Sequence, residues 1–140
     1  NEREHSQALS RASVALLFDI VPPLLRAGES VILEANFKRD RDSKALREAC
    51  QIRSHIIQIV CQCPPELLQR RFRERIERGG RHLAHDDEAY LGEFSALANG
   101  TSCAPLDIRG TVIEVDTSRF SEALVDELAR NVRATIDSQR

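Results

Sequence analysis

Apolar residues recur at helical spacing at both ends of the chain. Pro22-Pro23 should end or kink the first helix, because proline lacks the N–H that a helix interior needs, and Gly28 is suited to terminate it. The last helix should be capped by Thr117 or Ser118. The residues predicted to face inward are Leu9, Ala12, Leu16, Ile20 and Leu24, with Leu17 and Val21 widening the face, and later Phe120, Leu124, Leu128, Val132 and Ile136.

Three short apolar runs predict β-strands. The first is Val31-Ile32-Leu33, which ends in Glu34, and the second runs from Ile56 to Cys61. The third, Thr111 to Val115, ends at Asp116. Runs without polar alternation are typical of buried strands in parallel sheets.

Helical segments separate these strands. Asp42 or Ser43 could cap a helix that continues to roughly Arg53, and Pro64-Pro65 opens another, a favoured place for proline. Asp86 or Asp87 should start a further helix. This alternation implies right-handed βαβ crossovers, and therefore an α/β fold whose parallel sheet has helices on both faces, in three layers.

The helix after Pro65 carries arginines along one edge. Arg71, Arg75 and Arg78 lie within about 60° of one another on a helix, beside the apolar face formed by Leu68, Phe72 and Ile76. Guanidinium groups that point the same way can bind several phosphate oxygens at once. The alternative is a solvated helix with ordinary pairs such as Glu74 with Arg78, and this segment alone leaves both interpretations open.

Composition narrows the class of protein. The 140 residues are 41% hydrophobic and 30% charged with a net charge of −2, which indicates one globular domain over residues 1–140 and no basic field for nucleic acid. No apolar run approaches the roughly 18 residues of a membrane span, and no secretory signal is visible. We therefore expect a cytoplasmic protein with no membrane partner. Because the chain opens at Asn1 and contains no methionine, we expect the natural protein to begin upstream.

The cysteines do not indicate a metal site. The four cysteines lack the spacing of a secreted disulfide framework, so we expect reduced thiols. Cys61 and Cys63 could combine with His82 and His85, but no second pair stands at finger-like spacing. We predict no metal bound by these residues.

Polar residues follow the predicted strands. Ligands of open α/β sheets bind beyond the carboxyl ends of the strands, which singles out Glu34, Asn36, Cys63 and Asp116-Thr117. A carboxylate that closes an apolar strand can hold a metal-bound water or orient a hydroxyl in a magnesium-nucleotide site. The alternative is that these strands simply end in a polar residue on entering solvent.

A second candidate region follows the arginine helix. Gly79-Gly80 could act as a hinge, so that Arg81-His82 and His85 swing over a phosphate. The alternative is a solvated loop, in which histidines are common.

Three segments together carry a family resemblance: RAGESVILEANF (26–37), QIVCQCPPELLQRRFRERIERGGRH (58–82) and TVIEVDTS (111–118). In order and spacing they resemble P-loop nucleoside triphosphate hydrolases of the small kinase or phosphotransferase type. This AAA-type ATPase group includes zeta-toxin-like, chloramphenicol-phosphotransferase-like and polynucleotide-kinase-like proteins.

The resemblance implies roles for particular residues. Arg71, Arg75, Arg78 and Arg81 would belong to a lid, at about residues 70–98, that closes on ATP and supports the transferred phosphoryl group. Glu34 would lie near Mg²⁺ and the phosphates. The resemblance also implies that the nucleotide is bound by Arg75, Arg81, Asp116 and Thr117. It places Asn36, His82 and His85 on the substrate side.

The chain also departs from this family. It has no Gly-x-x-x-x-Gly-Lys-Ser/Thr loop to hold phosphates, and the family's first strands are missing. The resemblance therefore implies an incomplete P-loop kinase-like fold. We expect the intact protein to be an ATP- and Mg²⁺-dependent kinase acting on a hydroxyl of a small molecule or nucleotide, and the fragment to be inactive. The alternative is a degenerate, non-catalytic binding or assembly module that self-associates through exposed sheet edges. Nucleic-acid binding is a weaker third possibility.

Overall fold

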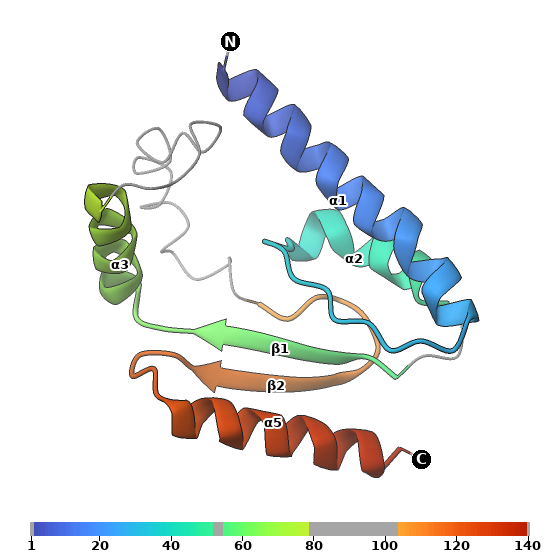
Figure 1. Cartoon of the computed structure of the whole chain (residues 1–140). Coiled ribbons are helices and arrows are strands. Elements are labelled where there is room, and N and C mark those ends of the chain that lie inside the picture. The colour runs from blue at the N-terminus through green and yellow to red at the C-terminus, as the bar shows by residue number, and fades with distance from the viewer. Residues whose placement is uncertain (1, 52–54, 79–103, 140) are drawn as a thin grey trace.

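The computed structural model describes residues 2–51, 55–78 and 104–139, and all structural statements below concern these ranges. Figure 1 shows two strands in the middle of the molecule, with helices on either side of them. In chain order the elements are α1 (Glu2–Arg26), α2 (Arg39–Ala49), β1 (Ile57–Gln62), α3 (Pro65–Arg78), β2 (Thr111–Asp116) and α5 (Glu122–Asp137).

Strands β1 and β2 form a two-stranded parallel sheet in the described residues. Their register runs from Ile57 opposite Thr111 to Gln62 opposite Asp116. Both strands lie within one residue of their predicted positions. The predicted parallel pairing is also confirmed by this register.

The predicted strand at Val31–Leu33 is wrong. The segment is not a strand, and the Ile32 side chain is 98% exposed. Residues 30–36 make no backbone hydrogen bond to the sheet within the described chain. Figure 1 shows this segment running in the same direction as β1 without pairing to it. An apolar run becomes a strand only when a neighbouring strand satisfies its N–H and C=O groups. No strand of the described ranges pairs with this run.

Helix α1 also differs from expectation. Pro22 and Pro23 lie inside it, and the helix continues to Arg26 before Gly28 adopts a positive φ of 82°. The predicted inward face is confirmed at Val21, which is 1% exposed, but it is wrong at Leu16, which is 58% exposed. Phe18, near Val21, stacks on Phe37 at a ring-centroid distance of 6.3 Å.

The long helix α1 is apolar for much of its length. By length and composition Gln7–Arg26 could cross a membrane, and it is mostly exposed in this structure. A helix of this kind near the start of a chain is weak support for membrane insertion. This segment contains the charged Asp19 and the pair Pro22-Pro23. We therefore interpret its exposed leucines as a surface for packing against protein rather than lipid.

Helix α2 begins before its predicted caps. It starts at Arg39 and ends at Ala49, so Asp42 and Ser43 lie within its first turns and are buried. The Asp42 carboxylate accepts the Lys38 backbone N–H at 2.6 Å and is held by Arg41 at 2.7 Å. Asp42 therefore satisfies the helix start from inside the helix rather than from the cap position.

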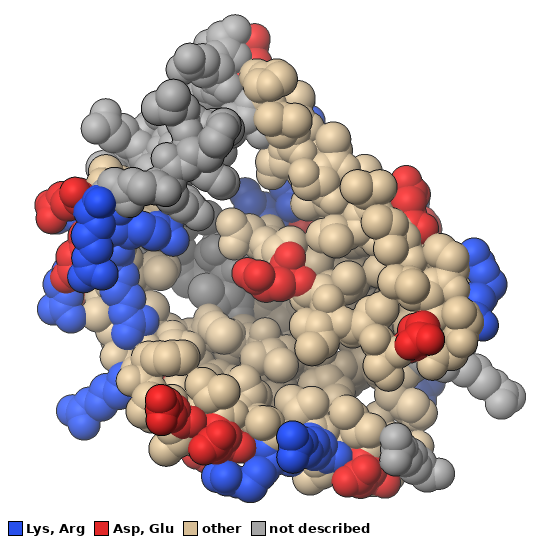
Figure 2. Space-filling view, in the orientation of Figure 1, with Lys and Arg blue, Asp and Glu red and all other residues tan. Residues whose placement is uncertain are grey.

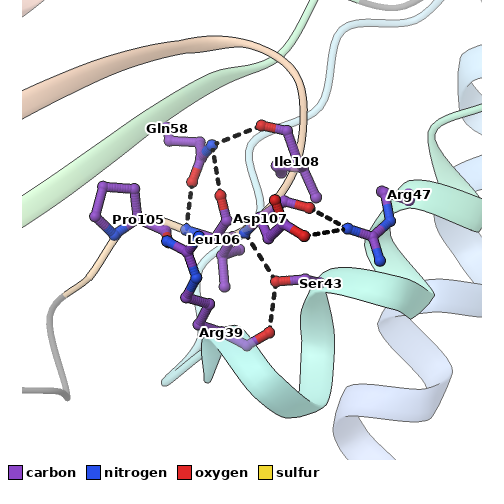
Figure 3. Close-up of polar contacts among 8 residues, drawn as sticks. All are labelled: Arg39, Ser43, Arg47, Gln58, Pro105, Leu106, Asp107 and Ile108. Atoms are coloured by element: carbon purple, nitrogen blue, oxygen red, sulfur yellow. Dashed lines mark hydrogen bonds and ion pairs between the residues drawn. The ribbon is translucent and has the colours of Figure 1, made fainter.

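A buried polar network ties α2 and β1 to the loop before β2 (Figure 3). The Gln58 amide donates to the carbonyls of Leu106 and Ile108, both at 3.3 Å, and its oxygen accepts the Leu106 N–H at 2.8 Å. Ser43 accepts the Asp107 N–H at 3.0 Å. The loop thus finds its backbone partners in side chains, as buried backbone groups require.

The entry to β2 requires a glycine. A Cβ on Gly110 would overlap the Ile56 carbonyl oxygen and lie 3.0 Å from the Ile56 Cβ. Thr111 N–H bonds to that same carbonyl at 2.9 Å. The close approach therefore sets the register at which β2 begins.

Helix α5 begins later than predicted. Its N-cap is Ser121, whose hydroxyl accepts the Leu124 N–H at 3.2 Å, rather than Thr117 or Ser118. Phe120, predicted to face inward, is 73% exposed, and Ile136 is 43% exposed. No residue of α5 is buried.

The hydrophobic core is small. Within the described residues the buried apolar side chains are Val21, Leu46, Ala49, Phe72 and Val115. Several apolar side chains of α1 and α5 are exposed, among them Leu16 at 58% and Ile136 at 43%, and are therefore available for further packing.

Candidate functional site

The carboxyl ends of β1 and β2 meet at one edge of the sheet. Gln62 and Asp116 are partners in the register, so the residues that follow each strand lie side by side. The Gln62 carbonyl accepts the Thr117 N–H at 2.8 Å and its hydroxyl at 2.9 Å. This is the edge where an open α/β sheet places its ligands.

Residues 116–118 form a tight turn, which we call the 116–118 corner. Asp116 accepts the Ser118 N–H at 2.8 Å, as aspartates at turns often do. Hydrogen bonding by Ser118 holds the pKa of the exposed Asp116 carboxyl below its ordinary value. Asp116 therefore faces solvent as a carboxylate at neutral pH.

Helix α3 starts directly after β1 and so lies at the same edge. Phe72 is buried, with Leu68 and Ile76 half-buried on the same face, as the helical spacing predicts. The Arg75 guanidinium lies over the Phe72 ring at 4.9 Å from its centroid. The apolar face therefore fixes which way the arginine edge points.

The predicted arginines are not equivalent. Arg71 reaches the 116–118 corner, where its Nη2 donates to the carbonyls of Thr117 at 2.8 Å and Ser118 at 3.1 Å. Arg78 instead pairs with Glu74 at 3.8 Å on the exposed side of the helix. Figure 2 shows the blue side chains gathered over α3. The solvated interpretation thus describes Arg78, whereas phosphate binding by the arginines of this helix stays a prediction.

Other predicted site residues are separate or outside the described chain. Glu34 and Asn36 are exposed on the segment between α1 and α2. Within the described residues no hydrogen bond or ion pair joins Glu34 to α3 or to Asp116. The predicted residues that lie outside the described ranges are Arg81, His82 and His85, together with the helix expected from Asp86 or Asp87.

Among the described residues, the cysteines form no disulfide. Cys61 is exposed, and Cys63 and Cys50 are half-buried. Burial raises the pKa of the Cys50 thiol, which keeps it protonated and poorly nucleophilic at neutral pH.

The contact between Arg71 and the corner was not predicted. Sequence spacing placed Arg71 among phosphate ligands, but its partners are carbonyl oxygens 46 and 47 residues away. Asp116-Thr117-Ser118 does carry a turn signature, since Asp and Ser favour local side-chain bonds. Nothing in that signature points to Arg71.

Comparison with known proteins supports a kinase-like fold. No protein-family model and no curated protein matches the chain. Among solved structures it is similar to a candidate kinase from Chloroflexus aurantiacus J-10-fl, with 25% identity and a TM-score of 0.79. The match covers 94% of this chain and 73% of that protein. The described α/β arrangement is compatible with the fold of that protein.

Proposed function

We propose that the natural protein is an ATP-dependent phosphotransferase that moves the γ-phosphoryl group to a hydroxyl of a small molecule or nucleotide. The observation that carries this proposal is the shared edge of the sheet, where Asp116, Thr117 and the arginine-bearing helix α3 meet. The likeness to a candidate kinase supports it. Phosphoryl transfer depends on positioning and on neutralising charge, both of which such an edge can supply.

The described residues do not complete a phosphate site. The sequence contains no Gly-x-x-x-x-Gly-Lys loop, so the backbone donors for the phosphates must come from outside these residues. The unpaired edge of β1 and the unpaired run at 31–34 support a further strand between them. Such a strand would end at the same edge as Asp116.

The described residues offer few ligands for a magnesium ion. No group of three or more His, Cys, Asp or Glu side chains that could hold a metal occurs among the described residues. Glu34 offers an exposed carboxylate, which could bind a metal-bound water but not a whole coordination shell. Under this proposal, the ion's main ligands are ATP and groups outside the described residues, and we derive no step from the ion.

The contributions of this chain's own residues can be stated. Asp116 and Thr117 would contact the nucleoside end of ATP. Arg75 and Arg78 would approach the phosphates, where charge-assisted hydrogen bonds are strongest. For Arg78, this requires leaving its ion pair with Glu74 for the phosphates. The loss of that pair costs little free energy because both side chains are exposed.

Calorimetry with MgATP tests the proposal. We expect the full-length protein to bind ATP, an Arg75→Ala,Arg78→Ala double variant to bind at least about tenfold more weakly, and an Arg130→Ala variant on α5 to match the wild type. Absence of affinity at millimolar ATP in the full-length protein would refute the proposal.

A non-catalytic assembly module is the second candidate. The observation that favours it is exposed apolar surface, with Leu16 at 58% and Ile32 at 98%. Nucleotide-independent dimerisation of the full-length protein in sedimentation experiments, without ATP affinity, would support this function over the kinase.

A further inference from the structure

The 116–118 corner is held by contacts from two elements. On one side, the Gln62 carbonyl at the end of β1 accepts both donors of Thr117. On the other side, Arg71 of α3 bonds to the carbonyls of Thr117 and Ser118. Internally, Asp116 accepts the Ser118 N–H. The backbone of the corner is thus bonded at Thr117 and Ser118, and the Asp116 side chain closes it from within.

Arg71 differs from its neighbours on α3 in what it contacts. Arg70 and Arg78 both pair with Glu74 of the same helix at 3.8 Å. Arg75 lies over Phe72, again within the helix. Among the described α3 arginines, Arg71 is the one that bonds across to the segment after β2.

The chemistry of this contact is that of backbone positioning. A guanidinium bonded to two carbonyls makes charge-assisted hydrogen bonds, and its planar fork loses little entropy per bond. Arg71 is half-buried, so water competes less for those carbonyls than at the exposed arginines. Removing it leaves both carbonyls without their partner and frees the corner to adopt other conformations.

We propose that Arg71 is a positioning residue rather than a ligand of the transferred phosphate. It holds the 116–118 corner in the conformation that binds the nucleotide. The contact of Arg71 with the corner rests on the observed geometry alone. Its effect on nucleotide binding rests on the proposed function. Arg71 acts through the corner, so its loss weakens nucleotide binding more than it slows turnover of the bound complex.

Hydrogen exchange tests the contact independently of ATP. In the full-length protein without ligand, we expect Arg71→Ala to speed exchange of the Thr117 and Ser118 amides by roughly tenfold. Without Arg71 the corner opens more often, which breaks the bonds that these amides donate to Gln62 and Asp116. Arg71→Lys should give an intermediate rate. Arg73→Ala, an exposed arginine of the same helix, should leave the rate unchanged. Unchanged exchange in Arg71→Ala, or an equal rise throughout β2 and α5, would overturn the proposal.

Steady-state kinetics with calorimetry test the consequence. We expect Arg71→Ala to raise the Kd and KM for ATP about five- to tenfold while kcat changes less than about twofold. A large fall in kcat at unchanged Kd would overturn the positioning role and make Arg71 a catalytic residue. A wild-type protein that does not bind ATP would refute the proposed function, and the exchange data would then decide the Arg71 contact by themselves.

Discussion

At the scale of single residues, Asp42 shows how a carboxylate can be buried near the start of a helix. Its residue is 2% exposed, and the Lys38 N–H and Arg41 guanidinium bond to its oxygens at 2.6–2.8 Å. Burial by itself raises the pKa of this carboxyl, but the bonds from Arg41 and Lys38 outweigh it and lower the pKa below the ordinary 3.8. The charged form is therefore the one that stabilises the fold.

The sign of this shift predicts a pH dependence of stability. A carboxyl with a depressed pKa contributes stability above its unfolded pKa, about 3.9, which is lost as the pH falls through the folded pKa. We expect Asp42→Asn to lower the free energy of unfolding by about 1–2 kcal/mol at pH 7. The wild type and the variant should converge as the pH falls through the folded pKa of Asp42, which lies below the ordinary value.

Urea unfolding from pH 7 into the acid range measures this effect. The matched control is Asp40→Asn, an exposed residue of the same helix, which should follow the wild-type curve. If Asp42→Asn keeps the same acid slope as the wild type, the stabilising role of the charged carboxylate is contradicted.

At the scale of elements, local patterns were enough for some parts of the fold. Strands β1 and β2 and the buried Phe72 face of α3 followed from their own residues, because β-branched runs and helical spacing are local signals. The contact of Arg71 with Thr117 was not accessible in this way. It depends on two segments that only the folded sheet brings together.

The errors in the helices have physical causes. Helix α1 is apolar on more than one face, so packing against α2 and Phe37 decided that Val21 rather than Leu16 is buried. Several polar residues before α5 could serve as its N-cap. Ser121 is the N-cap, whereas the Ser118 N–H bonds to Asp116 within the corner. Caps and helix phases were settled by tertiary contacts that the sequence pattern does not contain.

Gln58 carries a prediction at this scale, because it joins two elements. Its side chain makes three hydrogen bonds to the loop before β2. We expect Gln58→Ala to lower the free energy of unfolding by about 2–3 kcal/mol, since buried loop groups lose their partners. Gln62→Ala, on the same strand but exposed, should cost less than about 0.5 kcal/mol. Equal losses in chemical denaturation would contradict the role of the Gln58 network.

At the scale of the whole molecule, the sheet of the described residues has an open edge. In the described chain β1 pairs on one edge, with β2. Beyond its other edge, the Val31–Leu33 run follows the same direction (Figure 1). The Ile32 side chain on this run is 98% exposed. An unpaired apolar edge invites a further strand, and the similar candidate kinase is longer than this chain.

Ile32 reports on whether such a strand is present. In the 140-residue chain Ile32 is 98% exposed, so Ile32→Ser should change the free energy of unfolding by less than about 0.5 kcal/mol. In a protein whose sheet is completed beside residues 31–34, the same substitution should cost about 1.5–3 kcal/mol, because the side chain is then buried. Leu46→Ala is the control. Because Leu46 is 4% exposed, this substitution should destabilise both proteins by about 2–5 kcal/mol. Parallel urea titrations of both proteins measure the difference. A small effect of Ile32→Ser in both would show that this segment stays at the surface, and the central strand would then have to lie elsewhere.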